Sequence, residues 1–279
     1  MIEARALAYD YSGEEEPSSP ALSGINLDVH RGEYLALIGP NGSGKTTLLK
    51  LLNALLTPSN GEVRVEGIST VDEEKTPQIH RICGMIFQNP DNQLVATTVE
   101  EDIAFGLENL ALPSAEIRQR VADVARLLGL DHLLQKPPHL LSGGEKQRVA
   151  IAGVLAMQPG CILMDEPTAM LDPAGRHDVI ETVRMLNRNQ DIAVVHVTHF
   201  PEEAAYADRV IVLDQGRLVR QGPPAEVLND LQLLHSLGLQ GTAAIELAAL
   251  LREDGFILPP QLLHCRELVN SLCSLERKS

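Results

Sequence analysis

The sequence predicts an α/β fold with a mixed, largely parallel sheet at its core, and three observations point to it. An apolar run at residues 33–38 leads into a glycine-rich loop, and leucines at helical spacing follow at residues 46–56. A second set of apolar runs is almost continuous, as is typical of parallel strands covered on both faces, and comprises residues 161–164, 192–198 and 209–213. Between the two sets, residues 91–157 show helical patterns, so we expect an inserted helical subdomain there.

Shorter elements flank this core. Strands are predicted at residues 2–11, 24–29 and 62–66, and a hairpin joins the run at 209–213 to residues 217–222. Charge and prolines mark residues 13–20 as an exposed loop. After Gly222 the composition shifts to prolines and leucines, so we expect a nucleotide-binding domain at residues 1–222 and a helical C-terminal extension at residues 223–279.

Composition narrows the functional classes. The 279 residues are 44% hydrophobic, which is enough for a substantial core, and no apolar run approaches the roughly 18 residues that span a bilayer. The first residues lack a secretory pattern, so we expect the chain in the cytoplasm. A net charge of −15, 3% aromatic residues and no Trp argue against a nucleic-acid partner. The four cysteines lack C-x-x-C spacing and are expected to be free thiols.

The loop at residues 39–47 reads GPNGSGKTT between a strand and a helix, the context that the motif G-x-x-x-x-G-K-[ST] requires. Its glycines let backbone N–H groups converge on phosphate oxygens at a helix N-terminus. Lys45 adds a positive charge for the β- and γ-phosphates, and the Thr46 hydroxyl is left to coordinate Mg²⁺. The predicted nucleotide-binding residues are Gly39, Pro40, Asn41, Gly42, Ser43, Gly44, Lys45, Thr46 and Thr47.

Two acidic residues, Asp165 and Glu166, follow the apolar run at residues 161–164. The carboxyl edge of a parallel sheet is where α/β proteins collect ligands. We expect Asp165 to bind Mg²⁺ directly or through water. Glu166 is expected to orient and polarise the attacking water, since phosphoryl transfer relies on positioning and charge stabilisation.

The segment LSGGEKQR at residues 141–148 predicts a helix whose N-terminus can face an anion. Ser142 and the N–H groups of Gly143 and Gly144 can donate hydrogen bonds to a γ-phosphate. Ser142 and Glu145 also fit a plain capping box, which is compatible with phosphate binding.

The spacing H-x-x-H at His196 and His199 does not predict a shared metal ion. Residues three apart on an extended strand point to opposite faces. We therefore expect His196 to be a core residue of the sheet.

In this order the three motifs resemble the ATP-binding cassette family over about residues 2–222. Residues 39–47 match its Walker A loop, Asp165 and Glu166 its Walker B strand, and residues 141–148 its signature, with Glu145 in place of the commoner Gln. The resemblance implies a P-loop NTPase cassette with a mixed core sheet, an antiparallel β subdomain, an inserted helical signature subdomain and a small helical C-terminal extension. It further matches Gln88 to the Q-loop, Asp172 to the D-loop, His199 to the switch histidine and Tyr11 to the adenine-stacking aromatic residue, with Tyr9 as the alternative.

An ATP sandwich follows from this resemblance. Two cassettes pack head to tail, so that each phosphate loop holds ATP and Mg²⁺ against the other subunit's signature, and one cassette per chain needs a partner. His199 would hydrogen-bond the γ-phosphate. Gln88 would sense Mg²⁺ and water and link the site to the helical subdomain. Hydrolysis would then open the dimer.

Residues 87–109, FQNPDNQLVATTVEEDIAFGLEN, resemble the ATPase subunits of energy-coupling factor transporters, including cobalt, nickel and vitamin systems. The wording NPDNQ, the MLDP at residues 170–173 and the tail after Gly222 are most similar to the first of the two ATPases in vitamin-type modules. The resemblance implies micronutrient uptake powered from the cytoplasmic face of the membrane, beneath a transmembrane coupling subunit and a membrane substrate-binding subunit. A heterodimer with a second ATPase is favoured, and a homodimer stays open.

An acidic cluster at Glu100, Glu101 and Asp102 follows Thr98, which forms a predicted capping box with Glu101. The cluster complements the helix dipole. By the same resemblance, we hypothesise that it also receives an arginine from the membrane subunit.

Three alternatives are kept beside this interpretation. They are another ABC importer or exporter, a cassette ATPase acting on DNA or the ribosome, and a nucleotide sensor that does not hydrolyse ATP. The C-terminal extension is expected either to hold a dimer or to pack on its own cassette, with buried faces formed by Leu247, Leu250, Leu251, Leu268, Val269 and Leu272.

Overall fold

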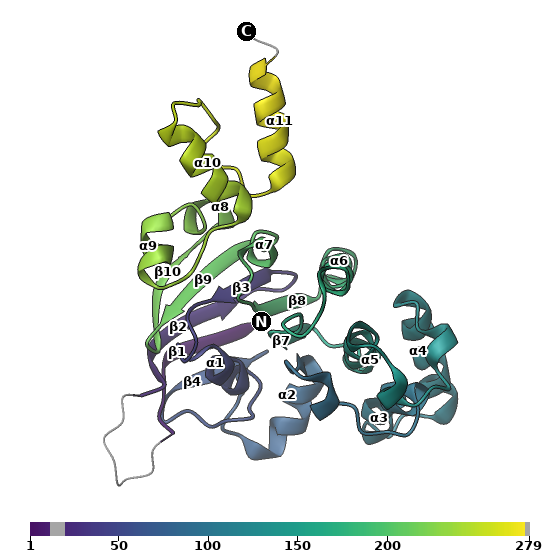
Figure 1. The fold of residues 1–279 in the computed structure, drawn as a ribbon. Coiled ribbons are helices and arrows are strands. Elements are labelled where there is room, and N and C mark those ends of the chain that lie inside the picture. The colour runs from purple at the N-terminus through teal and green to yellow at the C-terminus, as the bar shows by residue number, and fades with distance from the viewer. Residues whose placement is uncertain (12–19, 277–279) are drawn as a thin grey trace.

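Two β-sheets organise the described part of the chain, residues 1–11 and 20–276, in this computed structural model (Figure 1). The strands are β1 (Ile2–Tyr9), β2 (Leu22–Val29), β3 (Tyr34–Ile38), β4 (Asn60–Val65), β5 (Ile68–Ser69), β6 (Cys83–Ile86), β7 (Cys161–Asp165), β8 (Ala193–Val197), β9 (Arg209–Asp214) and β10 (Arg217–Gly222). The core sheet has the order β10-β9-β3-β8-β7-β6, and only its β10-β9 pair is antiparallel. The second sheet, β2-β1-β4-β5, is antiparallel.

Both sheets agree with the predicted fold class. The mixed core sheet and the antiparallel β subdomain are present, and the first four predicted strands divide between them. The predicted loop at residues 13–20 lies outside the described residues except for Pro20.

Helices cover both faces of the core sheet (Figure 1). They are α1 (Lys45–Leu52), α2 (Thr76–Ile82), α3 (Val99–Asn109), α4 (Ser114–Leu127), α5 (Gly143–Ala156), α6 (Pro173–Gln190), α7 (Pro201–Ala204), α8 (Pro224–Val227), α9 (Leu231–Ser236), α10 (Ala243–Glu253) and α11 (Cys265–Glu276). Helices α3, α4 and α5 form a lobe beside the sheet, within the predicted helical subdomain (Figure 1).

Strand β3 shows why its apolar run is continuous. Leu35 and Leu37 face a core shared with α1 and the antiparallel sheet. Tyr34, Ala36 and Ile38 face the opposite core, shared with α5 and α6. Alternate side chains of a strand point to opposite faces, so burial on both faces leaves no position for a polar residue.

Helix α1 ends earlier than predicted. The pattern favoured a helix over residues 46–56, but the helix stops at Leu52. Ala54 takes a left-handed conformation with φ of 56°, and the N–H groups of Leu55 and Leu56 return to the Lys50 carbonyl. These bonds satisfy a carbonyl at the helix end, as left-handed C-terminal caps do.

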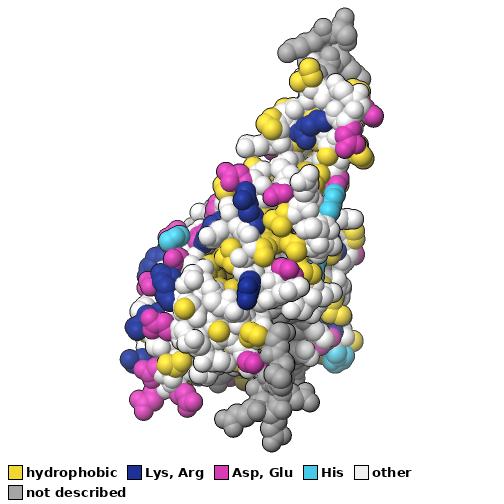
Figure 2. Space-filling view, turned by 90° about the vertical axis from the view of Figure 1, so that its left-hand side faces the viewer, with side chains coloured by type: hydrophobic (Ala, Val, Ile, Leu, Met, Phe, Trp, Pro, Cys, Tyr) yellow, Lys and Arg dark blue, Asp and Glu magenta, His cyan; other side chains and the backbone are white. Residues whose placement is uncertain are grey.

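The C-terminal extension has two parts. Helices α8 and α9 insert Val227, Leu228 and Leu234 into the core of the cassette. Helices α10 and α11 form a small core of their own with the intervening segment, made of Ala244, Ala248, Leu258, Leu262 and Leu268. This part projects from the body and carries hydrophobic side chains on its surface (Figure 2).

Three residues of the extension differ from expectation. Leu268 is buried and Leu251 and Leu272 are partly buried, but Leu247, Leu250 and Val269 are exposed. The apolar stripes of α10 and α11 are thus wider than the face that each helix buries within this chain.

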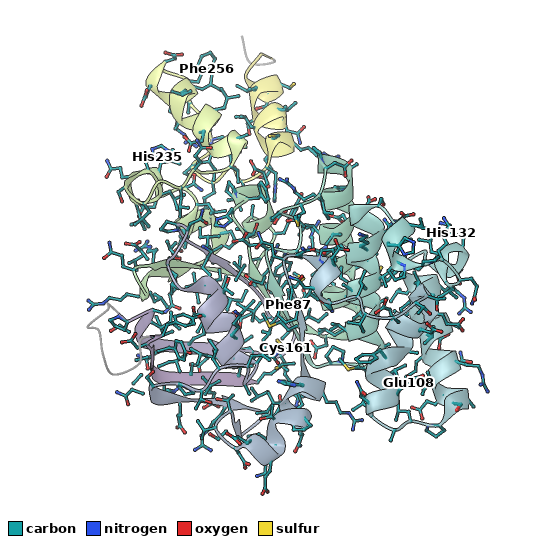
Figure 3. The ribbon with its side chains drawn as sticks, turned by 60° about the horizontal axis from the view of Figure 1, so that its bottom comes forward. Phe87, Glu108, His132, Cys161, His235 and Phe256 are labelled. Carbon is teal, nitrogen blue, oxygen red and sulfur yellow. The ribbon has the colours of Figure 1, made fainter. Side chains whose placement is uncertain are left out.

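All four cysteines are free thiols, as predicted. Cys83 and Cys161 are buried directly opposite each other on β6 and β7, and Figure 3 shows Cys161 in the interior of the molecule. Cys265 and Cys273 are exposed on α11. No helix within the described ranges has the length and apolar character needed to cross a membrane.

The contact between β6 and α5 leaves no room for a side chain at Gly84. A Cβ atom there would lie 2.2 Å from Cγ1 of Val154. Overpacking of this kind costs about 1–3 kcal/mol, so we expect Gly84→Ala to lower the free energy of unfolding by that amount in urea denaturation. Val154→Ala removes the obstructing methyl groups, so the double variant should lose less than the sum of the two single variants. Additive losses would contradict the contact.

Candidate active site

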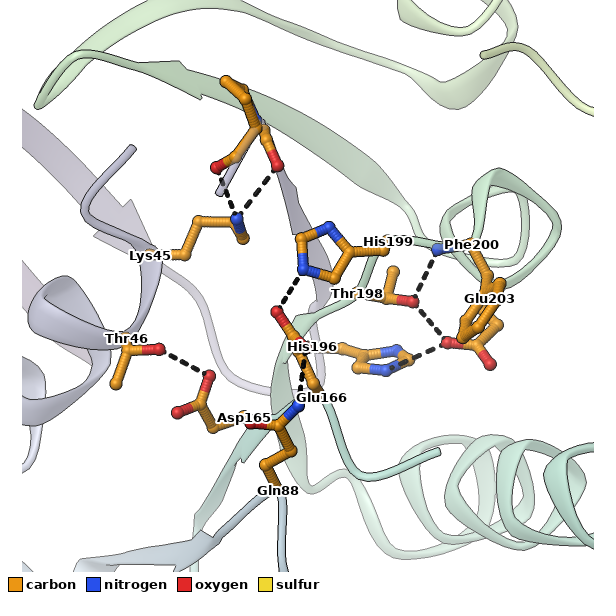
Figure 4. A network of polar contacts seen from close by, with 12 residues as sticks. Lys45, Thr46, Gln88, Asp165, Glu166, His196, Thr198, His199, Phe200 and Glu203 are labelled. Carbon is orange, nitrogen blue, oxygen red and sulfur yellow. Dashed lines mark hydrogen bonds and ion pairs between the residues drawn. The ribbon is translucent and has the colours of Figure 1, made fainter. Parts of the chain in front are cut away.

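The phosphate loop connects β3 to α1 as predicted. Gly42 and Gly44 have φ of 77° and 101°, a region that favours glycine, and a Cβ at Gly44 would lie 2.6 Å from the Ala21 carbonyl oxygen. Lys45 Nζ donates to the carbonyl oxygens of Gly39 and Pro40, both at 2.9 Å (Figure 4). The buried Oγ of Ser43 has no hydrogen-bond partner among the described residues. The loop therefore holds a buried ammonium and an unpaired hydroxyl at the start of a helix, where an anion is favoured.

Thr46 meets Asp165 at the edge of the sheet. The Thr46 hydroxyl donates to Asp165 Oδ1 over 3.0 Å, which joins the first turn of α1 to the end of β7 (Figure 4). A hydroxyl and a carboxylate are hard oxygen ligands, and Mg²⁺ is bound in nucleotide sites by one or two such groups with phosphates and water. The residues present thus fit the predicted Mg²⁺ site.

Glu166 lies at the centre of the side chains that the sequence assigned to catalysis. Its Oε1 contacts His199 Nε2, and its Oε2 accepts a hydrogen bond of 3.0 Å from Gln88 Nε2 (Figure 4). Its backbone has φ of 49°, and its N–H donates to the Val197 carbonyl at the end of β8. A left-handed non-glycine residue persists only where its surroundings determine it strongly. The structure therefore brings three predicted catalytic residues from three separate segments into one cluster.

Burial shifts two pKa values in this site in opposite directions. It lowers the pKa of Lys45, although the carboxylates of Glu166 and Asp165 partly offset the effect. It raises the pKa of Asp165, against the hydrogen bond from Thr46. Each charged form lacks solvation that an anion beside Lys45 and a cation beside Asp165 would restore.

Tyr11 lies closer to the phosphate loop than the alternative Tyr9 does. Its hydroxyl is 3.0 Å from Thr47 Oγ1, and its ring is 61% exposed. Tyr9 is partly buried against the core, and its ring makes a T-shaped, edge-to-face contact with the Tyr11 ring. An exposed ring beside the loop favours Tyr11 for stacking on adenine, and this assignment stays a prediction.

The signature forms a different local group. Ser142 accepts from the Glu145 N–H, and the Glu145 carboxylate accepts from the backbone and hydroxyl of Ser142, so the capping box is confirmed. A Cβ atom at Gly143 would contact Leu171, and one at Gly144 would contact Gly175. Both of these neighbours lie close to Asp172, which caps α6. The signature and the D-loop are therefore neighbours, and the described hydrogen bonds of the Ser142 hydroxyl stay within the capping box.

The chain matches the family model described as ABC transporter over residues 22–169. It belongs to the ABC transporter family. The energy-coupling factor transporter ATP-binding proteins EcfA1 of Symbiobacterium thermophilum and Clostridium novyi are 51% and 48% identical to it. The alignments cover 98% and 99% of this chain and 97% and 99% of those proteins. The predicted resemblance to energy-coupling factor ATPase subunits is confirmed.

Solved structures of ABC cassettes share the fold. The cbiO1 protein from Clostridium perfringens, part of the ABC transporter complex cbiONQ, has a TM-score of 0.77 at 36% identity and covers 90% of this chain and 98% of its own. The ATP-binding cassette MJ0796, a dimer in a post-hydrolysis state bound to ADP and Pi, has a TM-score of 0.73 at 32% identity and covers 80% and 99%.

The two histidines of this ABC cassette separate as predicted. His199 faces Glu166, whereas His196 is fully buried, with Nδ1 2.9 Å from the Tyr34 hydroxyl. Burial lowers the pKa of His196 to about 3, so the ring is neutral and its 3.4 Å approach to Glu203 is no ion pair. Sequence reasoning missed Glu203, because no motif marks it.

The buried His196 contributes a loss of folding stability in acid. Its pKa is near 6.5 in the unfolded chain and about 3 in the folded one, so only the unfolded state binds this proton between those values. The free energy of unfolding therefore falls as pH drops through 6.5, by up to about 1.4 kcal/mol per pH unit. We expect His196→Gln to reduce the loss between pH 7 and pH 5 by about 2 kcal/mol in urea denaturation. The exposed His132→Gln serves as control, and an unchanged slope for His196→Gln would contradict the assignment.

Proposed function

We propose that the chain is the ATP-hydrolysing subunit of an energy-coupling factor transporter and that Glu166 positions the attacking water. One observation carries the proposal: Glu166 is held between His199 and Gln88, next to the Thr46–Asp165 pair at the phosphate loop. The EcfA1 relatives, which are named ATP-binding proteins, support the same function.

Each residue has a defined task in this proposal. The backbone of residues 39–47 and Lys45 bind the phosphates. Thr46 and Asp165 would hold Mg²⁺, which would neutralise charge on the transferred phosphoryl group. Glu166 accepts a hydrogen bond from the attacking water and orients it. His199 donates to the γ-phosphate. Gln88 reports the state of this cluster to the helical subdomain that follows it in the chain.

The proposed working form is a dimer of cassettes. The MJ0796 cassette has been solved as a dimer, and the exposed Ser142 and Gly143 are placed to donate to a nucleotide on another subunit. Driving such a dimer from 1:99 to 99:1 closed takes about 5.5 kcal/mol of differential binding. Two γ-phosphates, one at each composite site of the dimer interface, would supply contacts that are lost on hydrolysis. We propose a second, unlike ATPase as partner, with a homodimer as the other outcome.

Replacement of Glu166 tests the hydrolytic role. We expect Glu166→Gln to lower kcat about 100-fold or more while ATP still binds, because the amide cannot polarise water as a carboxylate does. ATP turnover and the dimer retained with Mg-ATP on size exclusion are measured in parallel. Glu108→Gln, on the exposed surface of α3, is the matched control. Wild-type turnover in Glu166→Gln would remove the proposal.

A groove beside the Q-loop is the proposed docking site for the membrane subunit. A cavity of about 400 Å³ is lined by residues of β6, α3 and α5, among them Met85, Phe105 and Val154. The ring of Phe105 is 50% exposed there. Three residues that line this cavity each have a buried polar atom without a hydrogen-bond partner among the described residues, namely Asn53 Oδ1, His80 Nε2 and Asp102 Oδ2. An apolar groove with unpaired polar atoms fits an amphipathic helix that carries a basic residue.

The acidic cluster next to this groove divides by environment. Glu101 is engaged with Thr97 and Thr98 in the capping box, and Glu100 accepts from Gln135. Asp102 is buried, with Oδ1 bonded to the Val95 N–H and Oδ2 unpaired. Of the three acidic residues, Asp102 is therefore the one that we propose to bind an arginine of the membrane subunit. Glu100 and Glu101 are not part of this proposal.

The docking role of Asp102 can be tested without altering the nucleotide site. We expect Asp102→Asn to weaken copurification with the membrane subunits about ten-fold or more, because one partner of a buried charge pair is lost. ATP affinity of the isolated chain should stay unchanged. Asp123→Asn, on the exposed face of α4, is the control. Full retention of the membrane subunits by Asp102→Asn would contradict this docking mode.

We propose that the chain sits at the cytoplasmic face of the membrane as a peripheral subunit. Its partners there are a transmembrane coupling subunit and a membrane substrate-binding subunit, and the cargo is a micronutrient chosen by the latter. On the face shown in Figure 2, acidic and basic side chains are interspersed, a surface unlike the basic stripe of a nucleic-acid-binding protein.

A further inference from the structure

A buried carboxylate lies behind the catalytic cluster. Glu203, on α7, is 3% exposed and accepts two hydrogen bonds from buried threonine side chains. Thr198 Oγ1 lies 2.5 Å from its Oε2, and Thr168 Oγ1 lies 2.7 Å from its Oε1. Figure 4 shows Glu203 beside Thr198 and His196, to the right of the pair formed by His199 and Glu166. One side chain thus joins two loops that are distant in sequence.

The two threonines belong to the loops that carry the catalytic residues. Thr168 follows Glu166 by two positions, and its carbonyl accepts from the Leu171 N–H, next to Asp172. Thr198 directly precedes His199, and its hydroxyl also accepts from the Phe200 N–H over 3.0 Å. A shift of either threonine would therefore move a residue that contacts the reacting groups.

A third element reaches the same carboxylate. Arg176, in the first turn of α6, has Nε 3.8 Å from Glu203 Oε1. Its guanidinium carbon lies 3.4 Å from the centre of the Phe200 ring. Because Asp172 caps this helix, Arg176 ties the D-loop helix to the same point that holds the other two loops.

We infer that Glu203 is a positioning residue that sets the distance between Glu166 and His199 through Thr168 and Thr198. The inference rests on the proposed function, in which Glu166 and His199 act on the water and the γ-phosphate. Glu166 has a left-handed backbone that its surroundings must maintain. Its N–H bond to Val197 restrains one side of the loop, and the link from Thr168 through Glu203 to Thr198 restrains the other.

Because Arg176 contacts Glu203, the position of this carboxylate also depends on the position of α6, the helix that follows the D-loop. Asp172 lies on a segment that adjoins the signature of the same chain. Movement of α6 on dimer closure would reach the two catalytic residues by way of Glu203. Hydrolysis would then depend on closure without any direct contact between Asp172 and the water.

The test separates kcat from KM in the assembled transporter. We expect Glu203→Ala, Thr168→Val and Thr198→Val each to lower kcat about ten-fold to a hundred-fold, the cost of misplacing a catalytic group by about 1 Å. KM for ATP should change less than about two-fold, because the phosphate-loop contacts are intact. Thr198→Ser keeps the hydroxyl and should restore turnover. Thr182→Val, on the exposed face of α6, is the control.

Combination of the variants distinguishes a shared device from general damage. Because both threonines act through one carboxylate, the loss in Thr168→Val with Thr198→Val should be smaller than the product of the single losses. The rate of ATP hydrolysis is divided by the concentration of sites that bind ATP, so that unfolded protein does not lower the value of kcat. Wild-type kcat in all three variants, or losses in kcat that Thr198→Ser fails to restore, would overturn the inference.

Glu166→Gln is measured in the same series. If it retains hydrolysis, the proposed function fails; if it abolishes hydrolysis while the Glu203 set stays active, only the positioning role fails. Should Glu203→Ala not fold, the two Val variants, which keep the shape of Thr, decide the question.

Discussion

The active site depends on one geometric constraint, that neighbouring parallel strands end at the same edge of the sheet. Strands β3, β8 and β7 lie side by side, so the phosphate loop, the segment with His199 and the pair Asp165 and Glu166 emerge together. Burial of these strands on both faces fixes their register, because a slip by one residue would turn every side chain of the strand toward the opposite core. The precision of the site therefore derives from the hydrophobic interior beneath it.

The polar groups proposed to bind nucleotide, at the sheet edge and in the signature, are held by local partners that nucleotide would replace. Lys45 donates to loop carbonyls, and Ser142 is held by Glu145 in a capping box. Both arrangements satisfy groups that would otherwise be costly to leave unpaired. Phosphate binding therefore has to break these internal hydrogen bonds. The free energy available for closing a dimer is lower than that of the new phosphate contacts by the cost of breaking them. The depressed pKa of Lys45 shows that its present solvation is incomplete.

Two further surfaces carry exposed apolar groups that the cassette does not bury. One is the groove beside Phe105, and the other is the projecting part formed by α10 and α11, where Leu247 and Leu250 are exposed and Phe256 lies near the outer end (Figure 3). Helices α8 and α9 place Val227, Leu228 and Leu234 in the cassette core, whereas the small core of α10 and α11 begins at Ala244. The domain boundary after Gly222 stays a prediction.

Local sequence determined the parts of this protein that short-range chemistry can specify: the phosphate loop, both capping boxes and the near-continuous apolar strands. Each depends on residues within a few positions, so spacing alone reveals it. Tertiary structure decided the rest. Helix α1 ended early at Ala54, and Asp102 became buried while Glu101 did not. Helix α6 and strand β6 were not predicted, although the cap at Asp172 and the spacing of Val179, Ile180, Val183 and Leu186 mark α6 in the sequence. Glu203 is the clearest case, because its partners are 5, 27 and 35 residues away and meet only when α6, α7 and the ends of β7 and β8 pack together.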